Sequence, residues 1–96
     1  MQVVIRNYSG KGSIELFDVL EERKAELEPL FRSVKGFVSY TLARSSSGGY
    51  SITVCQDQAG IDESIRVAKD FVAKNAGHID VSAPEVSVGT VLLHLK

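Results

Sequence analysis

The sequence predicts an α+β fold in which a four-stranded antiparallel sheet carries two helices on one face. Short β-rich runs, two amphipathic runs of helical period and a glycine-containing hairpin follow one another in the order βαββαβ. That order is the ferredoxin-like, split βαβ arrangement. With 96 residues, the chain is expected to form a single domain of this kind spanning residues 1–96.

The first half of the chain predicts one strand and one long helix. The run Gln2 to Tyr8 is β-rich and precedes the loop-forming residues SGKGS, so it is expected to be a strand. A helix should then run from about Ile14 to Val34, with Ser13 as its N-cap. Because proline lacks a backbone donor and clashes with the preceding turn, Pro29 predicts a kink or break near Leu27 to Glu28.

The second half predicts a hairpin, a helix and a closing strand. Strands from Phe37 to Arg44 and from Tyr50 to Gln56 are linked by SSSGG, whose glycines permit a tight turn. Apolar residues recur at helical spacing from Ile61 to Asn75. The run VSVGTVLLHL reads as the last strand, and the change of its apolar phase across Gly89 predicts a β-bulge there.

Bulky apolar residues occur on both sides of the predicted strands. Val3 and Ile5 would face one side of the sheet, and Val4 would face the other. A sheet face exposed to solvent would not require such residues, and a chain this short buries a thin core. The sequence therefore predicts a homodimer formed through the open sheet face.

The composition limits the classes of binding partner and the cellular compartment to be expected. The formal net charge is −1 without a block of like charges, so neither nucleic acid nor a membrane surface is an expected partner. The amino terminus lacks the features of a signal peptide, which leaves the cytoplasm as the expected location. The single cysteine, Cys55, cannot form an internal disulfide and is expected to be a small buried residue.

The segment GFVSYTLARSSSGGYSITVCQDQAG resembles the central hairpin of the antibiotic biosynthesis monooxygenase-like group of dimeric α/β barrels. The segment PEVSVGTVLLH is similar to the closing strand of that group. The resemblance implies that the sheet pairs with a second copy as a dimeric α/β barrel. Haem-degrading members of the group use a tryptophan early in the second helix. This chain has no tryptophan, so the resemblance does not imply haem binding, and we expect no cofactor.

The resemblance further implies a cofactor-independent monooxygenase or related small enzyme. Its substrate would be a hydrophobic phenolic or acidic small molecule bound in the cleft between helices and sheet. Because the group also contains members without known activity, the alternative is a non-catalytic homodimeric ligand-binding or accessory protein.

Arg23, Tyr40 and Tyr50 are the candidate ligand-binding residues. At about 100° per residue, Arg23 falls within the apolar stripe of the first helix, so it should point toward the sheet and could hold a carboxylate or phenolate. The alternative interpretation of Arg23 is that its alkyl chain packs against the protein while its guanidinium extends into water. Tyr40 and Tyr50 flank the hairpin and could donate hydrogen bonds, although tyrosines in strands commonly serve packing.

Asn7 and His94 are the candidate catalytic residues. They should lie on the first and last strands, and a histidine can act as a general base near neutral pH. His94 is also close to the chain end, where fraying is common. His78 and Asp80 offer two metal ligands, but no further ligand stands at a recognisable spacing, so no metal site is expected.

Overall fold

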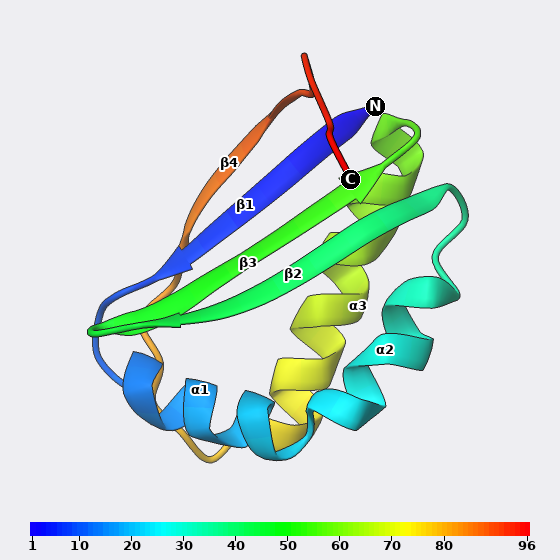
Figure 1. Ribbon diagram of the computed structural model, residues 1–96. Helices are drawn as coiled ribbons and strands as arrows, with labels where there is room; N and C mark the ends of the chain where they lie inside the picture. The colour runs from blue at the N-terminus through cyan, green and yellow to red at the C-terminus, as the bar shows by residue number, and fades with distance from the viewer.

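The computed structural model describes residues 1–96 and consists of a four-stranded antiparallel sheet with its helices on one face (Figure 1). The elements in chain order are β1 (Gln2–Tyr8), α1 (Ser13–Glu22), α2 (Lys24–Arg32), β2 (Phe37–Ser45), β3 (Gly48–Cys55), α3 (Gln58–Ala76) and β4 (Glu85–Thr90). The strands lie side by side in the order β2-β3-β1-β4. The predicted α+β class and ferredoxin-like topology are confirmed, with the first helix divided into two.

The central strands β1 and β3 set the two faces of the sheet. They pair antiparallel, with Val4 opposite Thr53 and Arg6 opposite Ser51. These side chains are buried beneath the helices, whereas Ile5, between Val4 and Arg6, is exposed on the opposite face. Because successive residues of a strand alternate between faces, β1 supplies both the helix-covered side and the open side.

The break in the first helical region lies at Arg23, so the prediction of a break near Leu27 to Glu28 is wrong. Arg23 leaves helical geometry, with φ −107° and ψ 18°, and Pro29 lies inside α2. The reason is tertiary: α1 packs against β3 and α2 against β2, so the chain must turn between them. Pro29 removes only one intrahelical hydrogen bond, which α2 tolerates.

The N-cap of α1 also differs from the prediction. Gly12 occupies the cap with φ 78°, and Ser13 is the first helical residue, with a buried hydroxyl that has no hydrogen-bond partner. A Cβ atom at Gly12 would collide with the backbone of Asp80. Close approach of these two segments, together with the left-handed backbone, therefore requires glycine at the cap.

Two apolar clusters lie between helices and sheet. The larger consists of Leu16, Phe17, Leu20, Leu27, Phe31, Phe71 and Ala76. The smaller consists of Val4, Val34, Cys55 and Ile61. Cys55 is fully buried, as the sequence predicted. α3 begins three residues before the predicted start, because the Asp57 carboxylate caps it by accepting a hydrogen bond from the Gly60 amide at 3.0 Å.

The last strand is shorter than predicted and contains no bulge at Gly89. β4 ends at Thr90, and its pairing with β1 runs without a register shift through Gly89. The change in apolar phase instead marks the end of the strand. The sheet's irregularity is in β2, between Phe37 and Ser39.

The residues after β4 form a tail over the open side of the sheet, drawn in red in Figure 1. The Val91 amide donates a hydrogen bond to the Met1 carbonyl, which anchors the start of the tail. Leu92, Leu93 and Leu95 are then 95, 76 and 81% exposed. None of the helices of this chain combines the length and the hydrophobicity needed to cross a lipid bilayer.

Candidate functional site

A buried arginine without an acidic partner lies at the centre of the helix-covered sheet face. The alternation of β1 carries the Arg6 side chain under the helices, where the residue is 4% exposed. One terminal nitrogen, Nη2, donates to the Ser51 hydroxyl at 3.2 Å, and the other, Nη1, has no partner. A buried cation is costly unless it is paired, so this position is suited to an anion.

Tyr40 and Ser51 continue the polar row from Arg6 across neighbouring strands. The Ser51 hydroxyl on β3 lies 3.4 Å from the Tyr40 hydroxyl on β2. The Tyr40 ring stacks on Phe31 of α2, with centroids 4.0 Å apart and an interplanar angle of 14°. Arg6, Ser51 and Tyr40 therefore connect three strands on a single face of the sheet.

Burial sets the ionisation of this row. It raises the pKa of Tyr40 and of Tyr8, so both phenols are protonated at neutral pH and can donate hydrogen bonds. Burial lowers the pKa of Arg6, but a guanidinium starts so high that it still carries its charge. The row is thus a set of donors with one positive charge.

A cleft of about 580 Å³ opens from Arg6 and Tyr8 toward α3 and the connection that precedes β4. Its walls are mainly apolar, with Ala68 and Val72 from α3 and Val81 from the connection. A much narrower space, of about 20 Å³, continues past Arg6 to Ser51 and Tyr40. Apolar walls with a few convergent polar groups, at this size, are typical of small-molecule sites.

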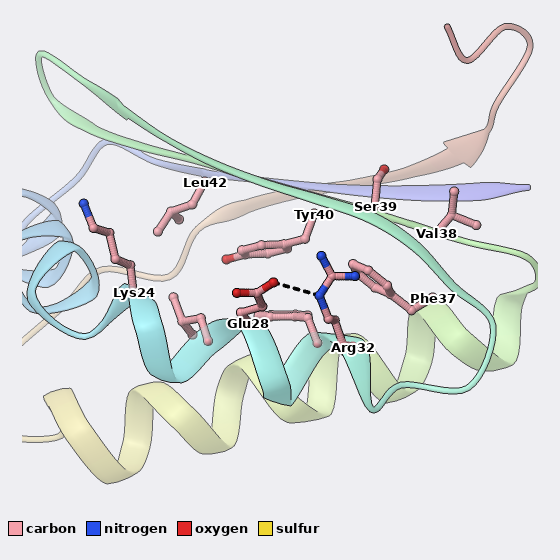
Figure 2. A pocket seen from close by; sticks show the side chains of 10 residues that line it. Lys24, Glu28, Arg32, Phe37, Val38, Ser39, Tyr40 and Leu42 are labelled. Carbon is pink, nitrogen blue, oxygen red and sulfur yellow. Dashed lines mark hydrogen bonds and ion pairs between the residues drawn. The ribbon is translucent and has the colours of Figure 1, made fainter. Parts of the chain in front are cut away.

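A second hollow, of about 430 Å³, lies between α2 and β2 (Figure 2). Tyr40 and Phe31 line both this hollow and the narrow space beside Arg6. Charged groups stand at its edge: Arg32 donates to the Glu28 carboxylate at 2.9 Å, and Lys24 makes no ion pair. The stacked pair therefore forms the wall between two depressions in the helix–sheet layer.

Arg23 does not point toward the sheet, and that expectation is wrong. Its guanidinium pairs with the Glu26 carboxylate at 3.0 Å, and its side chain is 43% exposed. It lines the outer groove between α2 and α3. The helical phase cannot be carried through Arg23 because the helix breaks at that residue.

The other candidates are spread over different parts of the sheet. Asn7 and Tyr50 pair directly across β1 and β3, on the face away from the helices. On β4 the residue opposite Asn7 is Glu85, the first residue of the strand. His94 lies beyond Thr90, where β4 ends, so the expected placement of His94 on the last strand is wrong. Among the candidates, only Tyr40 lines the narrow space beside Arg6.

Arg6 and Ser51 were missed in the sequence. The available signal was the alternation in β1, which places Arg6 on the same face as the apolar residue Val4. A charge in register with a core residue is unusual enough to suggest a site. No group of three or more histidine, cysteine, aspartate or glutamate side chains is arranged to hold a metal ion.

Comparison with known proteins identifies solved structures that share this fold. No protein-family model and no curated protein matches the chain. A solved protein of unknown function, NE2512 from Nitrosomonas europaea, has a TM-score of 0.72 at 16% identity, over 99% of this chain and 91% of that chain. A variant of MhuD with two manganese protoporphyrin IX molecules per active site has a TM-score of 0.70 at 17% identity, over 100% and 99%.

A candidate antibiotic biosynthesis monooxygenase from Bordetella bronchiseptica has a TM-score of 0.64 at 20% identity, over 96% of each chain. At these identities the likeness shows the fold alone. The resemblance to antibiotic biosynthesis monooxygenases is therefore confirmed as a likeness of fold.

Proposed function

We propose that the protein is a small monooxygenase-like enzyme that binds a hydrophobic phenolic or acidic molecule in the cleft between α3 and the sheet. Arg6 would hold the negatively charged oxygen of the ligand, and Tyr40 would donate to the same group. The observation that carries the proposal is the buried Arg6 guanidinium, with Nη1 lacking a partner beside an apolar cleft.

Oxygenation of a phenol without a cofactor requires few catalytic groups from the protein. The ionised phenol is electron-rich and supplies the electrons: phenol and O₂ give a quinone and water, so one oxygen atom enters the ring and the other leaves as water. The protein's share is to bind the anion, orient it and exclude bulk water. A positive donor in an apolar cleft meets these requirements.

A specific observation favours a second candidate function, namely binding without catalysis. The titratable groups that line the cleft and its inner extension are Arg6, Tyr8, Tyr40 and Lys69, and no carboxylate or histidine is among them. No group there is an evident general base for a phenol proton. A ligand-binding or accessory protein would need none.

An oxygen-uptake and binding experiment separates the candidates. We would screen phenols and quinones by calorimetry and follow O₂ consumption and product formation with each compound that binds. Arg6→Gln is expected to weaken binding of anionic ligands about tenfold or more, because a charge-assisted hydrogen bond is lost. Arg23→Ala, which alters an arginine outside the cleft, is the matched control and should bind normally.

Binding with O₂ uptake supports the enzyme, and binding without uptake supports the accessory protein. Equal affinity of the native protein and Arg6→Gln would contradict both, because each places the ligand on Arg6.

We also propose that a second copy of this chain covers the open sheet face. Ile5 and Tyr50 are exposed there, and the tail that follows β4, with its exposed leucines, runs over the same side of the sheet (Figure 1). Apolar side chains gathered on one face mark an interaction surface. Light scattering should give the mass of a dimer, and Ile5→Asp should shift it to that of a monomer; a monomeric native protein would refute the pairing.

A further inference from the structure

We propose that Ser51 is a positioning residue, which directs the Tyr40 hydroxyl proton into the narrow space beside Arg6, so that Arg6 and Tyr40 both donate to the ligand oxygen. Such a site would select the ionised form of its ligand over the neutral form. The inference rests on the proposed function, because it assumes that the ligand oxygen binds beside Arg6.

The direction of the hydrogen bonds follows from what each group can do. A guanidinium can only donate, so Ser51 must accept the bond from Arg6. The Ser51 hydroxyl is buried, and its own proton has the Tyr40 oxygen as its partner at 3.4 Å. With its oxygen accepting from Ser51, Tyr40 is left to donate its proton elsewhere.

The Tyr40 ring has little freedom to change this arrangement. It is stacked on Phe31, which fixes the position of the phenol oxygen. The remaining freedom is rotation of the O–H bond, and hydroxyl protons rotate to suit their partners. Ser51 occupies the acceptor side of that oxygen, so the favoured orientation turns the proton toward the space that Arg6 also faces.

The charges around this space agree with selection of an anion. Arg6 and Tyr40 face it from β1 and β2, Tyr8 from β1, and Lys69 stands in the adjoining cleft on α3. No carboxylate lines either space. A neutral phenol would need an acceptor for its own proton, which neither the Arg6 guanidinium nor the Tyr40 proton supplies, whereas its anion would accept both bonds.

The probe is 4-nitrophenol, whose anion is yellow and whose acid is almost colourless, so absorbance reports the ionisation of the bound dye directly. In the native protein, the pKa of bound 4-nitrophenol should fall by at least about one unit, which corresponds to tenfold preference for the anion. In Ser51→Ala, we expect that pKa to rise by about half a unit to one unit, and the neutral dye to bind within about twofold of native affinity.

Three variants give this test its controls. Ser51→Thr retains a hydroxyl and should restore the native dye pKa. Thr53→Val removes the next buried hydroxyl on the same face of β3, which has no hydrogen-bond partner, and should leave the dye pKa unchanged. In a Tyr40→Phe background, Ser51→Ala should have no further effect on the dye pKa, because Ser51 acts through Tyr40.

The outcomes separate this inference from the function on which it rests. If native protein fails to bind the dye or to lower its pKa, the anion site and this inference both fall. If native protein lowers the pKa but Ser51→Ala does so equally, only the role of Ser51 falls. Equal weakening of neutral and ionised dye would indicate a merely structural role and would overturn the inference. Should Ser51→Ala not fold, Ser51→Cys, with a weak S–H donor, must show the same direction of change.

Discussion

Replacing Arg6 by methionine tests whether the buried guanidinium serves ligand binding at the expense of stability. The residue is 4% exposed, it has no carboxylate partner, and its Nη1 makes no hydrogen bond. An unsatisfied buried donor costs about 1–3 kcal/mol. Apolar replacement of buried ionic groups is often neutral or stabilising by about 1–4 kcal/mol.

The substitution also removes one stabilising interaction, because Ser51 would no longer accept a hydrogen bond from Arg6. A single hydrogen bond contributes about 1 kcal/mol net. We therefore expect Arg6→Met to raise the free energy of unfolding by about 1–2 kcal/mol. For a domain of this size, each kcal/mol corresponds to a rise of about 4–8 °C in the melting temperature.

Urea denaturation and thermal melting at one fixed protein concentration would measure the change, because the proposed dimer would make apparent stability depend on concentration. Arg44→Met is the matched control. Arg44 pairs on the surface with Asp18 at 3.2 Å and Glu21 at 3.0 Å, so its loss should lower stability by about 0–1 kcal/mol. Destabilisation of the Arg6→Met protein by more than about 1 kcal/mol would refute the reasoning.

Three further outcomes are expected. Gly49→Ala should lower the free energy of unfolding, measured in urea, by more than about 2 kcal/mol, because a Cβ there collides with Phe17 and the Ala43 carbonyl. Gly89→Ala is the control, because nothing lies within 4 Å of its Cβ position, and it should change the free energy of unfolding by under about 0.5 kcal/mol. Equal effects of the two variants would contradict the role given to the space around Gly49. The pKa of Cys55 is raised by burial and then by nearby carboxylates, so its thiol stays protonated at neutral pH. Ellman's reagent should react with native Cys55 far more slowly than with unfolded protein, and similar rates would show that the thiol is accessible. Lys11→Ala breaks an exposed ion pair with a 2.7 Å separation and should lower stability by less than about 1 kcal/mol; a melting temperature more than about 8 °C lower would give the pair a larger role.

The fold could be predicted because its signals are local. The apolar positions Ile61, Ile65, Ala68 and Val72 repeat at helical spacing, and α3 does turn them toward the core clusters. The break at Arg23 could not be predicted in the same way. It depends on which strand each half of the helix packs against, and that is decided by contacts distant in sequence.

The site was harder to predict because both faces of β1 are apolar in sequence. Val3 and Ile5 support one face as well as Val4 supports the other, so the chain does not say which face the helices cover. Arg6 becomes a candidate only when that face is known. Tyr40 could be chosen from its position in the hairpin, but its neighbour Ser51 gains its role only from the pairing of β1 with β3.

The alternation of β1 makes one strand a common wall between two compartments. Arg6 belongs to the helix-covered side, whereas Ile5 and Asn7, its immediate neighbours in the chain, belong to the open side. Deleting a single residue from this strand would therefore exchange the two sets of side chains, placing a charge on the open face and apolar groups under the helices. The proposed ligand contact and the proposed subunit contact therefore depend on alternate residues of one seven-residue strand, and a shift of register would alter both.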